Sequence, residues 1–111
     1  MTIRIWLDDC RKMPKGFTHH CVNIHQAINL FQDLKSGVFN QVEYISFDHD
    51  LGEKQDTGYD LATWIEKKVY LGKMKPPRWS IHSANPVGRK RIKAAMIAAN
   101  RFYNFKEGKM V

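Results

Sequence analysis

Three short apolar runs, each followed by polar residues, dominate the pattern of the chain. They are rich in β-branched and aromatic side chains, which predicts buried strands over 3–7, 42–47 and 79–83. A weaker strand is expected near His20–Asn23, and a short last strand near Phe102–Phe105. The spacing of these runs leaves room for helices between them.

Three amphipathic helices are predicted, because apolar positions recur there every three or four residues. Each begins after a side chain that can cap a helix N-terminus, namely Asn23, Thr57 and Asn85. The expected spans are Ile24–Lys35, Gly58–Leu71 and a third helix that starts at Pro86, with Gly37 as the stop signal of the first.

Strands that alternate with helices predict a parallel sheet with right-handed crossovers. Only about ten residues, Cys10 to His19, separate Asp9 from the second strand, and a parallel crossover usually needs a dozen or more. The helix that usually forms such a crossover, between the first and second strands, is therefore expected to be reduced or lost. We expect one domain over residues 1–111, an α/β fold with a three-layer parallel sheet.

Charge narrows the choice of partner. The 111 residues carry a formal net charge of +7, which favours anionic partners such as nucleotides, nucleic acid or phosphorylated ligands. Cys10 and Cys21 form no disulfide or metal-binding pattern, and no apolar stretch approaches the ~20 residues that span a bilayer. A cytoplasmic protein without a membrane span is expected.

Polar side chains follow each of the three main strands, and the carboxyl ends of parallel strands meet at one edge of a sheet, where ligands bind. Unpaired carboxylates that converge there repel one another, so a divalent cation is a natural neutraliser, and oxygen ligands suit Mg²⁺ or Mn²⁺. The candidate metal ligands are Asp8, Asp9, Asp48 and Asp50; the last has the alternative of a turn hydrogen bond to Gly52.

Acid–base and phosphate-binding groups accompany these carboxylates. His49 and His82 are candidates for proton transfer, since a neutral imidazole acts near neutral pH. Ser83, Asn85 and Arg11 are candidates for binding phosphate at the start of the third helix. Alternatives stand beside these roles: both histidines as structural supports, Asn85 as an N-cap only, and Arg11 as a solvated loop residue.

The order of these motifs resembles a known family. The segments are Leu7-Asp8-Asp9-x-Arg11-x-x-Pro14, Ser46-Phe47-Asp48-His49-Asp50-Leu51-Gly52, Thr57-Gly58-Tyr59-Asp60 and Ile81-His82-Ser83-Ala84-Asn85-Pro86. Together they are similar to the cyclic-phosphate-processing receiver-like family, a divergent branch of the two-component receivers with a flavodoxin-like fold. The resemblance implies that Asp8, Asp9 and Asp50 contact a metal ion, that Asp48 is the phospho-accepting position, and that Ser83 is the switch hydroxyl.

Two functions follow from the resemblance and the residues together. The first is a metal-dependent phosphoesterase acting on cyclic-phosphate nucleotides or RNA-terminal cyclic phosphates, with weak nonspecific nucleic-acid binding as an added partner. The second is a degenerate receiver that serves as a phosphorylatable or metal-bound signalling module. The receiver lysine has no clear counterpart, and Lys106 and Lys109 are candidates only by position. That gap and the two histidines favour the enzyme.

Overall fold

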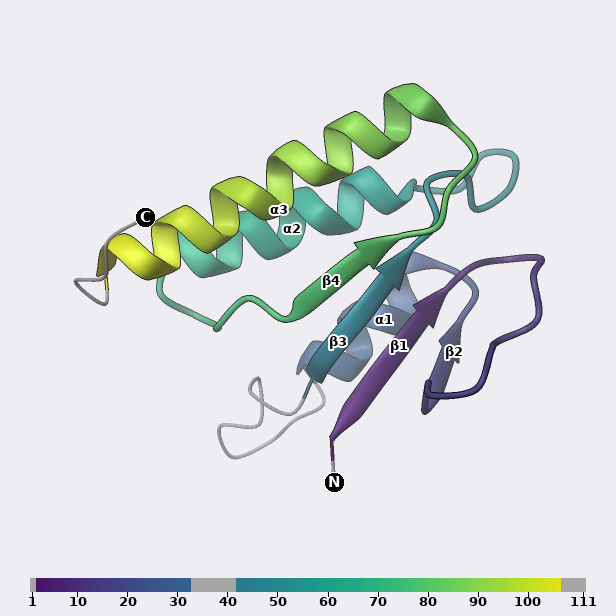
Figure 1. Cartoon of the computed structure of the whole chain (residues 1–111), viewed down its shortest axis with the longest axis horizontal. Coiled ribbons are helices and arrows are strands. Elements are labelled where there is room, and N and C mark those ends of the chain that lie inside the picture. The colour runs from purple at the N-terminus through teal and green to yellow at the C-terminus, as the bar shows by residue number, and fades with distance from the viewer. Residues whose placement is uncertain (1, 33–41, 107–111) are drawn as a thin grey trace.

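The computed structural model describes residues 2–32 and 42–106, and Figure 1 shows the arrangement of their elements. In chain order the elements are β1 Ile3–Leu7, β2 His19–Cys21, α1 Ile24–Gln32, β3 Val42–Phe47, α2 Gly58–Tyr70, β4 Arg78–Ile81 and α3 Pro86–Lys106. Three predictions fall outside the described residues: the last turn of the first helix at 33–35, its stop at Gly37, and the candidate Lys109.

The strands form one parallel sheet in the order β2-β1-β3-β4. The register pairs Leu7 with Phe47 and Phe47 with Ile81, so the three main strands end on one line. Their arrows point the same way in Figure 1. The predicted parallel sheet is confirmed, and its carboxyl edge gathers the polar residues that follow β1, β3 and β4.

The predicted last strand is wrong, because Phe102–Phe105 belongs to α3. The aromatic run favours a strand when it is considered alone, yet the apolar spacing of the helix continues into it from Met96 and Ala99. The Phe102 ring packs edge-on against Tyr70 of α2, with centroids 5.2 Å apart. Packing against the neighbouring helix decides the conformation, and the described part of the sheet has four strands.

The three helices share one core on one face of the sheet. Phe31 of α1 meets Trp64 of α2 with ring centroids 5.7 Å apart, and α2 lies alongside α3 (Figure 1). Ile5 and Ile45 are fully buried in the same cluster. Alternate strand positions point to this face, so it supplies the hydrophobic stability of the domain.

A loop covers the opposite face. Residues 8–18 connect β1 to β2 without a helix, which confirms that the crossover helix between the first two strands is lost. Trp6 is buried but lies outside the helix-side core, and Phe17 of the loop packs edge-on against both Trp6 and Tyr44, at 5.2 and 5.8 Å. The third of the three expected layers is therefore a loop rather than a layer of helices.

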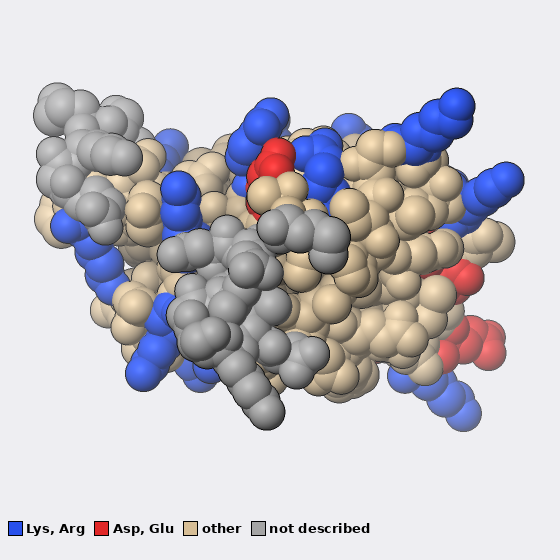
Figure 2. Space-filling view, turned by 90° about the horizontal axis from the view of Figure 1, so that it is seen from below, with Lys and Arg blue, Asp and Glu red and all other residues tan. Residues whose placement is uncertain are grey.

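The surface reflects the basic composition. Lys and Arg side chains ring the face shown in Figure 2, whereas Asp and Glu gather at fewer points. None of the helices in residues 2–32 and 42–106 combines the length and the apolar character that a membrane crossing requires.

Candidate metal and phosphate site

Three side chains converge at the carboxyl edge of the sheet. Asp8, Asp48 and His82 each offer a ligand atom, and these atoms all lie within 4.8 Å of one another. The ladder extends one residue past the strands, since the Asp48 amide donates to Leu7 O and the His82 amide donates to Phe47 O, both at 2.9 Å. The parallel register therefore places the three residues side by side.

Asp8 is fully buried and firmly held. Its Oδ1 accepts hydrogen bonds from the amides of Cys10 and Arg11, both at 2.8 Å, while Oδ2 lies 3.0 Å from His82 Nε2. His20 Nε2 contacts the main-chain oxygen of Asp8 at 2.7 Å. Burial raises the pKa of Asp8, but the two amides and the imidazole outweigh it and leave the pKa below the ordinary value. Asp8 is therefore ionised at neutral pH.

Asp48 experiences the opposite balance. Burial and the charge of Asp8 raise its pKa, and the His49 amide, the His82 imidazole and the Ser83 hydroxyl only partly oppose this. The His49 amide donates to Asp48 Oδ1 at 2.8 Å. Two carboxylates this close repel each other, and a bound cation removes the repulsion.

His82 completes the group and is held on several sides. Its Nδ1 lies 2.7 Å from Ser46 Oγ, which accepts a hydrogen bond from Ser80 Oγ at 3.0 Å. The Trp6 indole stacks on the imidazole, with centroids 3.7 Å apart and planes within 7°. Burial lowers the pKa of His82 more than the carboxylates of Asp8 and Asp48 raise it. The imidazole is thus neutral near pH 7, as a metal ligand must be.

The donor set fits a divalent cation. Asp8 and Asp48 supply carboxylate oxygens, which suit Mg²⁺ and Mn²⁺, and His82 adds a nitrogen, which divalent transition metals accept readily. The Ser46 hydroxyl can either donate or accept, so His82 can change tautomer without losing that hydrogen bond. Sequence reasoning placed His82 among the acid–base groups, and the structure adds it to the candidate ligands.

Two predicted ligands lie outside this group. Asp9 is exposed, with its carboxylate beside Gly52. Asp50 is exposed too and contacts His49 Nδ1 at 2.9 Å and Asn85 Nδ2 at 3.3 Å; these hydrogen bonds hold its pKa below the ordinary value. The roles of Asp9 and Asp50 as metal ligands stay predictions.

His49 lies under the first turn of α3. A Cβ at Gly88 would overlap the His49 ring, so glycine at this position lets the imidazole approach the helix. Asn85 Oδ1 accepts from the Gly88 amide at 2.9 Å, which makes Asn85 the N-cap of α3. The helix therefore starts beside His49 and Asp50, at the same edge of the sheet.

Two arginines fix the segment that carries His82. Arg11 Nη1 donates to His82 O at 2.7 Å, and Arg89 Nη1 donates to Ile81 O at 3.2 Å and to Ser83 O at 3.0 Å. Ser83 is buried, and its Oγ accepts from the Asn85 amide at 3.1 Å. The predicted phosphate-binding residues Arg11, Ser83 and Asn85 are thus brought to the same edge.

Sequence reasoning missed several supporting residues. Strand alternation could have found three of them, since the register places Trp6 beside Ser46 and Ser46 beside Ser80, on the face away from the helices. No sequence signal marks the contacts of His20 and Arg89, which depend on how loop and helix fold back.

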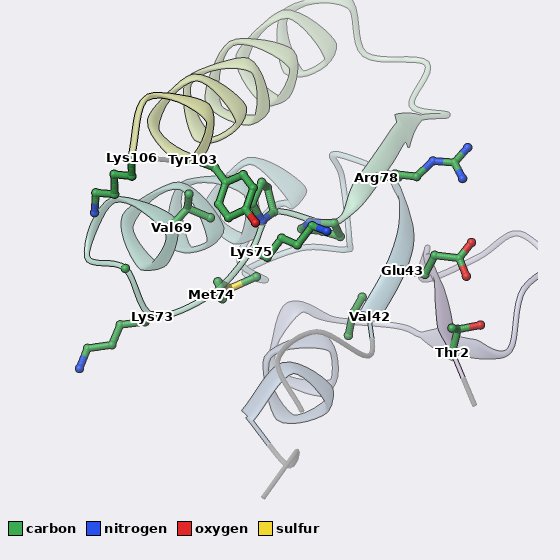
Figure 3. A pocket seen from close by; sticks show the side chains of 13 residues that line it. Thr2, Val42, Glu43, Val69, Lys73, Met74, Lys75, Arg78, Tyr103 and Lys106 are labelled. Atoms are coloured by element: carbon green, nitrogen blue, oxygen red, sulfur yellow. The ribbon is translucent and has the colours of Figure 1, made fainter. Parts of the chain in front are cut away.

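A separate cavity of about 760 Å³ lies at the opposite end of the sheet (Figure 3). It is bordered by Val42 at the start of β3, by Arg78 at the start of β4, and by Tyr103 of α3. Lys106 lines one side of the cavity (Figure 3), and its ammonium group donates to the main-chain oxygen of Tyr70. Lys106 therefore sits at the far end of α3, roughly 30 Å along the helix from Pro86, and does not replace a receiver lysine beside Asp48.

Comparison with known proteins identifies a family for most of the chain. A family model described as the cyclic-phosphate processing receiver domain matches residues 3–98, from β1 through most of α3, including every residue of the site. No curated protein and no solved structure gives a significant match. Since the match spans most of the 111 residues, the chain belongs to the cyclic-phosphate processing receiver domain family.

Proposed function

We propose that this chain is a metal-dependent phosphoesterase that opens cyclic phosphates on small nucleotides or RNA ends. The observation that carries the proposal is the convergence of Asp8, Asp48 and His82 within 4.8 Å. Mg²⁺ or Mn²⁺ held by these residues would polarise a phosphoryl group and neutralise its charge. The family match supports the coarser part of the proposal, a domain concerned with cyclic phosphates.

The substrate phosphate would lie between the acidic group and the N-terminus of α3. Helix N-termini favour anions through the positive end of the helix dipole. In the first turn of α3 Pro86 has no N–H and the Gly88 and Arg89 amides donate to Asn85, so the Val87 amide is the backbone donor left for a phosphate oxygen. Arg11 donates from Nη1 to His82 O, and a guanidinium carries further N–H groups that can bind a phosphate oxygen. Ser83 lies beside Asp48 and supplies a hydroxyl at the same place.

His49 is the better placed of the two histidines for proton transfer. Its Nδ1 contacts the Asp50 carboxylate at 2.9 Å, which fixes the tautomer with the proton on Nδ1. Nε2 is then an acceptor, and it makes no hydrogen bond within the described part of the chain. In this role His49 would take a proton from the attacking water as its oxygen bonds to phosphorus, and would return it to the ribose oxygen released when the ring P–O bond breaks, while Asp50 orients the imidazole.

A phosphorylatable receiver is the second candidate, because Ser83 beside Asp48 repeats the arrangement expected of a receiver. The electrostatics around Asp48 count against it. The groups that shift the pKa of Asp48 are Asp8, His49, His82 and Ser83, with no lysine among them in the described residues. Lys106 sits at the far end of α3.

The test is hydrolysis of ribonucleoside cyclic phosphates by the purified protein with Mg²⁺, with Mn²⁺ and with a chelator. We expect turnover only with metal, abolished by Asp48→Asn and reduced ~10²–10⁴-fold by His49→Ala, the usual range for acid–base groups. His25→Ala is the matched control, since this exposed imidazole lies near Asp56 and, among the described residues, makes no contact with the site. Labelling of Asp48 by acetyl phosphate without turnover of any cyclic phosphate would favour the receiver instead.

A further inference from the structure

Trp6 occupies an unusual place for a buried tryptophan. Only 8% of its surface is exposed, yet it belongs to the loop-covered face and not to the helix-side core. Its neighbours there are the Phe17 ring at 5.2 Å and the His82 imidazole at 3.7 Å. One side of the indole therefore meets the loop, and one face meets a side chain of the site.

The contact with His82 restricts the imidazole in a way that its hydrogen bonds alone do not. Ser46 Oγ and Asp8 Oδ2 fix the two ring nitrogens at 2.7 and 3.0 Å. The indole lies flat against the ring, within 7° of parallel, and blocks rotation of the imidazole out of that plane. Together these contacts determine which nitrogen faces the Asp8 carboxylate.

The same indole also holds the loop that carries Arg11. Trp6 Nε1 donates to Arg11 O at 3.3 Å. The Arg11 amide donates to Asp8 Oδ1 at 2.8 Å, and its guanidinium donates to His82 O at 2.7 Å. Trp6 thus contacts both Arg11 and His82, and Arg11 in turn joins the Asp8 carboxylate to the main chain at His82.

We propose that Trp6 is a positioning residue of the site, which orients the His82 ring through its indole face and the Arg11 segment through its indole N–H. Within the described residues 8–18, no helix lies between β1 and β2 to cover this face of the sheet. The packed rings of Trp6 and Phe17 cover it instead. The inference rests on the proposed function for its catalytic consequence. The placement of His82 can be measured without any substrate or metal.

The test uses the metal-free full chain and long-range ¹H–¹⁵N correlation spectra of the His82 ring. In the wild type we expect a single tautomer with the proton on Nε2, because the carboxylate of Asp8 can only accept. Trp6→Leu removes the flat wall and should give averaged tautomer signals in a protein that is still folded. Its Mn²⁺ affinity should fall ~10–100-fold, as is usual when a support of a metal ligand is lost.

Two further variants separate positioning from general loss of packing. Trp6→Phe keeps an aromatic face but has no N–H, so it should retain the single His82 tautomer while hydrogen exchange of the Arg11 amide becomes faster. Phe17→Leu is the matched control, because Phe17 packs on the same indole at 5.2 Å and not on His82, and it should leave the His82 spectrum unchanged.

Wild-type His82 signals in folded Trp6→Leu, averaged tautomers in Trp6→Phe, or an equal change in Phe17→Leu would each overturn the proposal. A wild type that hydrolyses no cyclic phosphate would defeat the proposed function and leave this spectroscopic result intact.

Discussion

The two faces of the sheet serve different purposes. The helix-side face buries apolar side chains such as Ile5, Ile45 and Phe47, which contact all three helices in one cluster. The opposite face holds a chain of polar contacts from Ser80 through Ser46 and His82 to Asp8, of which Ser46 and Asp8 are buried and Ser80 and His82 half-buried. Successive residues of the same strands alternate between the two.

The difference shows how a small domain can place the apolar contacts that stabilise it on one face of the sheet and a group of polar side chains on the other. Apolar burial on the helix-side face supplies most of the hydrophobic stabilisation, at ~25 cal/mol per Å² of apolar surface removed from water. The other face can then keep two carboxylates close together, although Asp8 raises the pKa of Asp48. Substitutions on the two faces should therefore differ in magnitude and, at Asp48, in sign.

The largest effect is expected on the helix side. Phe31 is fully buried between α1 and α2, so Phe31→Ala should lower the free energy of unfolding by ~3–5 kcal/mol. Urea denaturation measures this loss. The rise in melting temperature on adding Mn²⁺ should be the same as in the wild type, because the acidic group lies beyond the strand ends; loss of that rise would mean that the two faces are coupled.

Gly88→Ala should produce a smaller loss of ~1–3 kcal/mol, the usual cost of overpacking. In an open helix position the same change would stabilise by up to ~1 kcal/mol, so the sign of the effect reports the contact with the His49 ring. Thermal unfolding and the chemical shifts of His49 measure the two consequences. Gly16→Ala is the matched control in open space, and its cost reflects only a backbone φ of 95°.

Asp48→Asn should raise the free energy of unfolding of the metal-free protein, whereas the two preceding substitutions lower it. Because burial and, to a smaller extent, the charge of Asp8 raise the pKa of Asp48, its ionisation disfavours the folded state, and this penalty grows as pH rises from the ordinary pKa through the raised pKa. The variant should melt higher than the wild type at neutral pH in chelator, and it should gain nothing from Mn²⁺.

Acidification should reduce the stability that the ionised Asp8 carboxylate contributes. The pKa of Asp8 is lowered in the folded state, so its contribution to stability is present above the ordinary pKa and is lost as pH falls through the folded value. Asp48→Asn, which lacks the opposing contribution of Asp48, should still show this acid-side loss, to which Asp50 and His82 also contribute because their pKa values are lowered too. A flat melting temperature from neutral pH to about pH 3 would contradict the assignment to Asp8.

The smallest effects are expected along the serine chain. Ser80→Ala removes only the donor to Ser46 and should change stability by ~0.5–1.5 kcal/mol, the net value of one hydrogen bond. Ser46→Ala removes the partner of His82 Nδ1 and should lower Mn²⁺ affinity ~10-fold or more. Calorimetric titration of the two variants compares them, and equal Mn²⁺ affinities would show that Ser46 does not support His82.

The sequence predicts most of the fold because the periodic signals are local. Capping residues Thr57 and Asn85 mark the starts of α2 and α3, and both caps are present in the structure. The run Phe102–Phe105 could not be assigned correctly, since its conformation depends on a contact with Tyr70 in another element. Aromatic content alone favours the wrong alternative.

The residues of the site also divide into those that the local sequence predicts and those that depend on contacts between elements. Asp8, Asp48 and His82 follow strands that the sequence marks clearly, so their convergence is predictable from parallel topology. Strand alternation places Trp6 on the face opposite Ile5 and Leu7, but its stacking on the His82 ring depends on how neighbouring elements pack and is not visible in the sequence. Arg89 contacts Ser83 through a bend between β4 and α3 that no local pattern encodes.

The most direct test of the metal-binding claim is calorimetric titration of Mn²⁺ into the wild type, Asp8→Asn, Asp48→Asn and Phe31→Leu, all at neutral pH. We predict one site per chain in the wild type and in Phe31→Leu, and no measurable binding at that site in the two aspartate variants. The group formed by Asp8, Asp48 and His82 would then be the cation site. Unchanged binding in both Asp8→Asn and Asp48→Asn would contradict the account.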